Sequence, residues 1–155
     1  KIHNAAKKLS LVVSNNLIEI SDVQEHIGVH REYNNFELQN AIAEKNVQKI
    51  FKIVHYFTTN KNKFPYPPIL GLLVSFFSKL LCIHGLNSRS EKHISEAIKI
   101  HPYFVSSYIS ASQKYSFQDC VRIIALLQVS DLKFKGVGGA AQYPLEELMV
   151  NILYK

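Results

Sequence analysis

Few residues in this sequence have the types and spacing that catalysis or metal binding requires. His26 and His30 lie four residues apart, which on one helix would bring two imidazoles to the same face. Gly28 lies between them, and no carboxylate completes a metal-binding motif. There is also no glycine-rich phosphate loop followed by Lys-Ser or Lys-Thr, and no nucleophile, base and acid in a recognisable arrangement. We therefore expect no catalytic residue, no cofactor site and no metal site.

The segment GVGGAAQ, at 136–142, is the remaining candidate for binding a phosphate group. It follows a predicted helix and precedes Pro144, which suits the start of another helix. Glycines between two helices are more typical of a hinge that ends a helix than of a phosphate-binding site.

Residues 21–42, SDVQEHIGVHREYNNFELQNAI, resemble at first a DNA-binding helix-turn-helix. That motif needs a small residue about four positions before the turn glycine and an apolar residue about six positions after it. These two positions hold Gln24 and Asn34, so the helices could not pack as the motif requires. The residues therefore argue against DNA reading by this element.

Charge and cysteine content further limit the binding partners and the cellular compartment that fit this sequence. Lys and Arg number 18 against 12 Asp and Glu, a net charge of +6. The lysines are scattered at helical spacing, which indicates solvated helix faces rather than a track for phosphates. Cys82 and Cys120 stand in apolar company, and neither belongs to a metal-binding pattern of Cys and His. We expect both to be buried free thiols in a reducing compartment.

The elements that must position these residues are helices, because helical periodicity dominates the chain and strand alternation is scarce. The pattern predicts about eight helices joined by short connections, with a first helix over about 2–13. N-caps are expected at Ser21, Asn34 or Asn35, Asn46, Ser88 and Ser116. Among the side chains expected to face the core are Phe36, Leu38, Ile42, Ala43, Val47, Ile50, Phe51, Val54, Phe57, Phe104, Val105, Tyr108, Ile109, Ala111, Val121, Ile124, Ala125, Leu127 and Leu132.

The longest apolar run, ILGLLVSFFSKLLCI from Ile69, contains Ser75, Ser78 and Lys79. It is too short for a transmembrane span, so it predicts a central core helix from Pro68 to His84. No signal peptide is visible. The chain begins inside an amphipathic pattern and without Met, so we expect a fragment of a longer protein.

Several segments, by their order and spacing, resemble the C-terminal half of the delta subunit of bacterial DNA polymerase III, the clamp-loader subunit that opens the sliding clamp. The family pattern includes SRE-[YF]-N-x-FEL-x-x-AI, a G-x-HPY junction and a helix ending D-x-x-x-K-x-G. The matching segments here are HREYNNFELQNAI, HPYFVSSYISASQKYS and SDLKFKGVG. Two departures occur: His30 stands in place of the serine of SRE, and the chain reads Lys99, Ile100, His101 where a glycine is usual before HPY.

The resemblance implies an all-α fold, a short helical lid remnant followed by a multi-helix collar bundle. Residues 1–33 would be the rest of the lid of an AAA+ module, and residues 34–155 the collar, the oligomerisation domain. In such clamp loaders the collars of five subunits pack in a ring, and the delta subunit does not hydrolyse ATP. The implied partners are the gamma/tau and delta-prime type subunits, the sliding clamp through a missing N-terminal domain, and DNA indirectly. The protein would be cytoplasmic, with no membrane contact.

An assembly module should expose apolar residues at its partner contacts. Tyr108 and Phe134 are the candidates for such contacts, and Lys133 and Lys135 for an approach to nucleic acid. Two alternatives remain. The chain could be the lid and collar of a sibling clamp-loader subunit with ATPase function, whose ATP motif would lie upstream. It could also be an independent helical DNA-binding domain.

Overall fold

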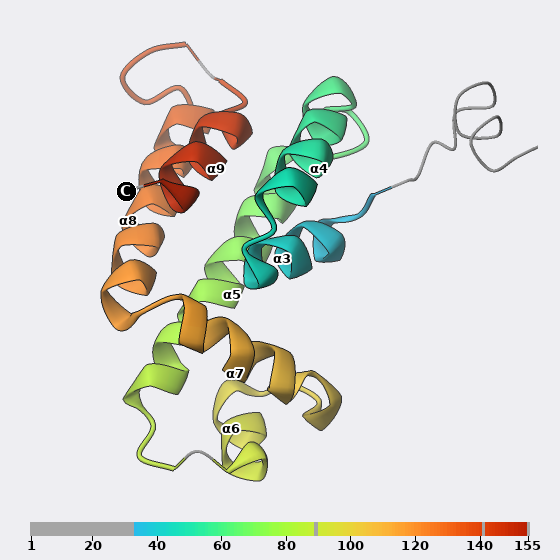
Figure 1. Ribbon diagram of the computed structural model, residues 1–155. Coiled ribbons are helices and arrows are strands. Elements are labelled where there is room, and N and C mark those ends of the chain that lie inside the picture. Colours follow the sequence, from blue (N-terminus) through green and yellow to red (C-terminus); the bar gives the residue numbers. More distant parts are fainter. Residues whose placement is uncertain (1–32, 89, 141, 155) are drawn as a thin grey trace, which may run out of the picture. The chain divides into compact units, whose positions relative to one another are not determined.

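The computed structural model describes residues 33–88, 90–140 and 142–154, and the regular elements in this part of the chain are all helices (Figure 1). The expected all-α fold is confirmed there, whereas the helices expected at 2–13 and after Ser21 lie outside the described residues. The α-helices are α3 Asn35–Glu44, α4 Val47–Thr59, α5 Tyr66–Gly85, α6 Glu91–Ile98, α7 Val105–Lys114, α8 Phe117–Phe134 and α9 Leu145–Leu153, with a 3-10 turn, η1, at Pro102–Phe104.

Helix α5 is the central helix, as its composition predicts. It contacts α3, α6, α7 and α8, and buried side chains occur along its whole length, from Tyr66 to Ile83. Helix α8 runs beside it, while α3 and α4 cross in front of it (Figure 1). The helix begins at Tyr66 rather than at Pro68, because Pro67 and Pro68 both fit the first turn, where no backbone N–H is needed.

By length and composition alone, α5 also meets the requirements of a membrane-crossing helix, with 20 residues and a mean hydropathy of 1.7. The apolar run was expected to be too short to span a bilayer, but the helix that contains it is long enough by this criterion. Its packing against four other helices accounts for the apolar sequence, since the core helix of a bundle needs the same composition.

Three of the predicted N-caps are confirmed. The side-chain oxygens of Asn34, Asn46 and Ser116 each accept a hydrogen bond from the backbone N–H three residues on. The cap predicted at Ser88 is wrong: Ser90 caps α6 by accepting from the N–H of His93 at 3.3 Å. Two residues in the SRSE segment had the right chemistry, and the backbone turns into the helix at the later one.

Several side chains predicted to face the core are instead exposed. Phe36 is 66% exposed, Phe104 53%, and Val121 and Leu132 47% each. Helix α8 buries Cys120, Ile123, Leu127 and Ser130, so Leu127 is buried as expected, whereas Val121 and Leu132 are not. Cys82 is exposed as well, against the prediction of two buried thiols.

Among the described residues, the ends of α3, α6 and α8 and one loop position have left-handed backbone. Gly136 has a φ of 77° and follows α8, and the N–H of Val137 donates to the carbonyl of Leu132 at 3.0 Å. This is the hydrogen-bond pattern of a glycine-terminated helix, so the predicted stop at the glycine-rich segment is confirmed. Lys99 ends α6 with a φ of 51°, and it occupies the position that the G-x-HPY pattern gives to glycine.

Candidate functional site

The four residues predicted from the sequence fall in two places. Lys133 and Phe134 lie in the last turn of α8, and Lys135 caps that helix, so these three are neighbours. Tyr108 lies on α7, beside α5. The structure therefore does not gather the four into one site.

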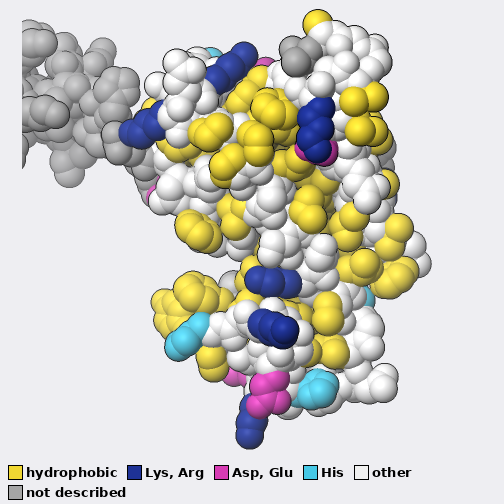
Figure 2. All heavy atoms as spheres, turned by 180° about the vertical axis from the view of Figure 1, so that it is seen from behind, with side chains coloured by type: hydrophobic (Ala, Val, Ile, Leu, Met, Phe, Trp, Pro, Cys, Tyr) yellow, Lys and Arg dark blue, Asp and Glu magenta, His cyan; other side chains and the backbone are white. Residues whose placement is uncertain are grey.

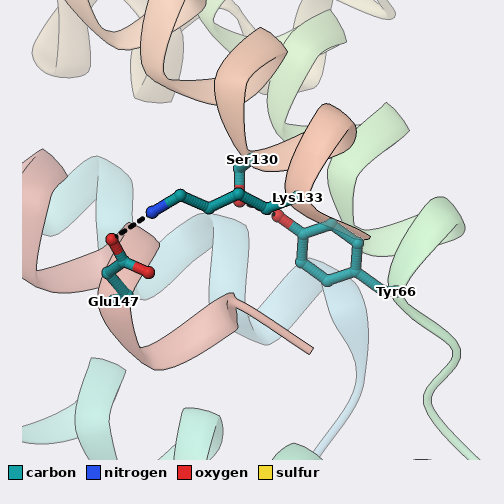
Figure 3. Close-up of polar contacts among 4 residues, drawn as sticks. All are labelled: Tyr66, Ser130, Lys133 and Glu147. Carbon is teal, nitrogen blue, oxygen red and sulfur yellow. Dashed lines mark hydrogen bonds and ion pairs between the residues drawn. The ribbon is translucent and has the colours of Figure 1, made fainter. Parts of the chain in front are cut away.

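Both lysines are held by carboxylates of the chain. The Lys133 Nζ lies 2.5 Å from the Glu147 Oε1, an ion pair that joins α8 to α9 (Figure 3). The Lys135 Nζ lies 2.5 Å from the Asp131 Oδ2, one helical turn earlier. These carboxylates offset the charge that a phosphate would meet, and the approach to nucleic acid stays a prediction.

Phe134 packs mainly inward. Its ring centroid is 5.0 Å from that of Tyr66, and it is half-buried against the core. The Tyr66 hydroxyl is hydrogen-bonded to Ser130 of α8, and burial raises the pKa of Tyr66 to about 12 (Figure 3). The Phe134 ring thus covers a polar contact between α5 and α8.

Tyr108 is 8% exposed, and its ring lies 5.3 Å from that of Phe76. Its hydroxyl accepts a long hydrogen bond from the Gln39 Nε2 at 3.5 Å, and burial raises the Tyr108 pKa. Most of this side chain serves the core. Partner contact by Tyr108 or Phe134 remains a prediction.

Two observations on the described residues bear on possible catalysis or metal binding. Burial raises the pKa of the Cys120 thiol to about 11, which leaves it protonated and weakly nucleophilic at neutral pH. Within residues 33–88, 90–140 and 142–154, no group of three His, Cys, Asp or Glu side chains is placed to hold a metal ion.

Helix α8 carries more exposed large hydrophobic side chains than any other helix that the structure describes. Phe117 and Val129 are 50% exposed, and Val121 and Leu132 are 47% exposed. At about 100° per residue these four positions fall within roughly 120° of the helix circumference. We call them the outer α8 face. Figure 2 shows hydrophobic side chains along the right-hand side of that view, where α8 lies.

Sequence reasoning missed this face. It assigned Val121 and Leu132 to the core and did not single out Phe117 or Val129. The signal was nevertheless present: the sequence FQDCVRIIALLQVSDLKF has apolar residues on both sides of the helix and no continuous polar side. A helix of that kind needs a second apolar neighbour.

Comparison with known proteins places this arrangement in a family. The model of the DNA polymerase III delta subunit, C-terminal domain, matches residues 32–152, which takes in α3 to α8 and all of α9 except its last residue. No curated protein and no solved structure matches the chain. The chain thus contains the C-terminal domain of a clamp-loader delta subunit, a component of DNA polymerase III, and it belongs to the family of DNA polymerase III delta subunits.

Proposed function

We propose that residues 34–155 are a non-catalytic assembly module, a helical collar that packs against other clamp-loader subunits through the outer α8 face. The observation that carries the proposal is the row of half-exposed apolar side chains at Phe117, Val121, Val129 and Leu132. The family match supports membership of the clamp loader, and the surface supplies a place for the contact.

The physical argument rests on the two sides of α8. Its inner side is used by the core, because Cys120, Ile123 and Leu127 are fully buried. Its outer side leaves large apolar side chains in water, and removing such surface from water is the main favourable term in most protein–protein association. A helix that is apolar on both sides is suited to lie between its own core and a neighbouring subunit.

The partners in this proposal are the gamma/tau and delta-prime type subunits. The sliding clamp would be contacted by the N-terminal domain of the parent protein, and DNA only indirectly. Residues 1–33 would complete the lid of an AAA+ module, and the protein would act in the cytoplasm. The start of the family match at residue 32 and the start of α3 at Asn35 support a domain joint near residue 33.

The test introduces one charge into the outer α8 face. Val121→Glu and Val129→Glu are each mixed with the gamma/tau and delta-prime type subunits and run on a sizing column beside the unmodified chain. We expect the unmodified chain to co-elute and both variants to lose at least about tenfold in affinity, because a carboxylate must be desolvated in an apolar contact.

Val47→Glu is the matched control, since Val47 is also exposed, at 36%, but lies at the start of α4. We expect it to co-elute normally. Co-elution of both α8 variants at full affinity would contradict the outer α8 face as the contact. Absence of co-elution by the unmodified chain would contradict the assembly function itself.

A further inference from the structure

A groove of about 470 Å³ is lined by residues of α3, α5 and α7, and no residue of the outer α8 face lines it. Its lining includes the apolar side chains of Phe36, Leu72, Ile100, Phe104 and Tyr108, together with the cation of Lys79. Clefts of roughly 300–1,000 Å³ are the size that accepts a bound group in proteins. The groove is thus large enough to take a bulky side chain from another molecule.

Two aromatic side chains of this groove are largely exposed to solvent. Phe36 is 66% exposed and Phe104 is 53% exposed, and neither packs against the hydrophobic core. They come from different elements, α3 and η1, yet line the same groove. Next to Phe104, the ring of Tyr103 is 79% exposed and lies edge-on at 5.1 Å. Aromatic side chains in such a position are typical anchors for a binding partner.

Lys79 supplies the positive charge in the lining of the groove. It is the sole Lys, Arg, Asp or Glu in α5, and it is half-buried. Its Nζ lies 6.0 Å from the centroid of the Tyr108 ring, and no ion pair to Lys79 is formed by the residues that the structure describes. A half-buried ammonium group beside apolar surface favours an incoming carboxylate, because the pair forms a charge-assisted hydrogen bond.

We propose that this groove binds an acidic amphipathic helix of a partner protein. An apolar side chain of that helix would enter between Phe36 and Phe104, and a Glu or Asp one turn away would pair with Lys79. This is the helix-in-groove mode, in which apolar anchors repeat at helical spacing. A nucleic-acid strand fits less well, since it needs several cations along its path and the groove lining has one.

The binding test uses the full chain labelled with nitrogen-15 and two synthetic helical peptides of about 15 residues, long enough to form a helix. One carries leucines and glutamates at i, i+4 spacing, and the other has lysine in place of each glutamate. We expect the acidic peptide to shift the backbone amides of α3, α5 and α7 that border the groove. The lysine peptide should bind at least about fivefold more weakly, because it cannot pair with the ammonium group of Lys79.

Two variants of Lys79 and one control sharpen the test. Lys79→Gln should lower the affinity of the chain for the acidic peptide by about fivefold, because one charge-assisted contact is lost. Lys79→Glu should reverse the preference, so that the lysine peptide binds better. Lys52→Glu changes an exposed lysine on α4 by the same charge and should leave both affinities unchanged.

The reversal separates a direct contact from a folding defect, because a misfolded chain would not gain affinity for the lysine peptide. Equal binding of the two peptides, amide shifts confined to α8, or displacement of the acidic peptide by an oligothymidylate would each overturn the proposal. The groove and the outer α8 face lie on different helices, so either can fail without the other.

Discussion

Lys99 adopts a left-handed backbone conformation at the end of α6, with a φ of 51°. A residue with a β-carbon pays about 1–2 kcal/mol for this conformation, whereas glycine adopts it freely. The family pattern G-x-HPY has glycine at this position. The departure visible in the sequence therefore falls at a position where the left-handed backbone favours glycine.

We expect Lys99→Gly to raise the free energy of unfolding by about 0.5–1 kcal/mol, since relief of the left-handed strain exceeds the added freedom of the unfolded chain. Urea unfolding followed by circular dichroism measures the change. Lys92→Gly, inside α6, is the control and should lower stability by about 1 kcal/mol. A less stable Lys99→Gly chain would show that the lysine side chain stabilises this turn.

At the scale of the element, the caps and the apolar faces differ in how well they can be predicted. Asn34, Asn46 and Ser116 were found from the sequence because an N-cap depends on a few neighbouring residues. Ser88 was chosen wrongly because Ser90 has the same hydroxyl and lies next to the helix start. Local chemistry thus identifies a helix start to within about two residues.

Ser116 caps a helix and Ser88 does not, so the same substitution at these two serines tests the contribution of a cap. Ser116 forms a full capping box with Asp119 at the start of α8. We expect Ser116→Ala to lower the free energy of unfolding by about 1 kcal/mol, through loss of a bond to an otherwise unsatisfied N–H. Ser88→Ala should change it by less than about 0.5 kcal/mol. Guanidinium unfolding of both variants measures this, and equal effects would mean that the cap at Ser116 contributes nothing of its own.

The buried side of α8 could not be predicted in the same way. Its sequence offers two apolar sides, and the choice depends on how α8 packs against α5, which is distant in the chain. The ion pairs show the same limit. Asp131 and Lys135 are one turn apart and could be paired from the sequence, whereas the pairing of Lys133 with Glu147 depends on the packing of α9.

At the scale of the whole molecule, buried tyrosines connect distant elements. The Tyr143 hydroxyl donates to the carbonyl of Phe64 at 2.8 Å, and the Tyr115 hydroxyl donates to the carbonyl of Ile42 at 2.8 Å. Together with Tyr66 and Ser130, these bonds join segments more than 60 residues apart in the chain. Burial raises the pKa of Tyr66 and of Tyr143 to about 12, and it raises the pKa of Tyr115 as well.

These shifts predict a loss of stability in alkaline solution. A tyrosine whose folded pKa exceeds its unfolded value of 10.0 holds its proton longer in the folded chain. The contribution of these tyrosines to the free energy of unfolding is therefore fully present below about pH 10 and is lost as pH rises toward 12. Cys120, raised from 9.0 to about 11, starts the decline earlier. Urea unfolding at a series of pH values measures the slope, and Tyr66→Phe should flatten it. A stability that is constant from pH 9 to 11 would contradict the burial of these groups.

The two cysteines differ in exposure, so the native chain can be labelled chemically at one of them. Cys82 is exposed on α5, while Cys120 is buried in α8 with its thiol held in the protonated form. A maleimide dye at neutral pH would therefore mark the central helix at one position without any substitution. A fluorescence signal from that position could report, in real time and on single molecules, when a partner arrives at this domain.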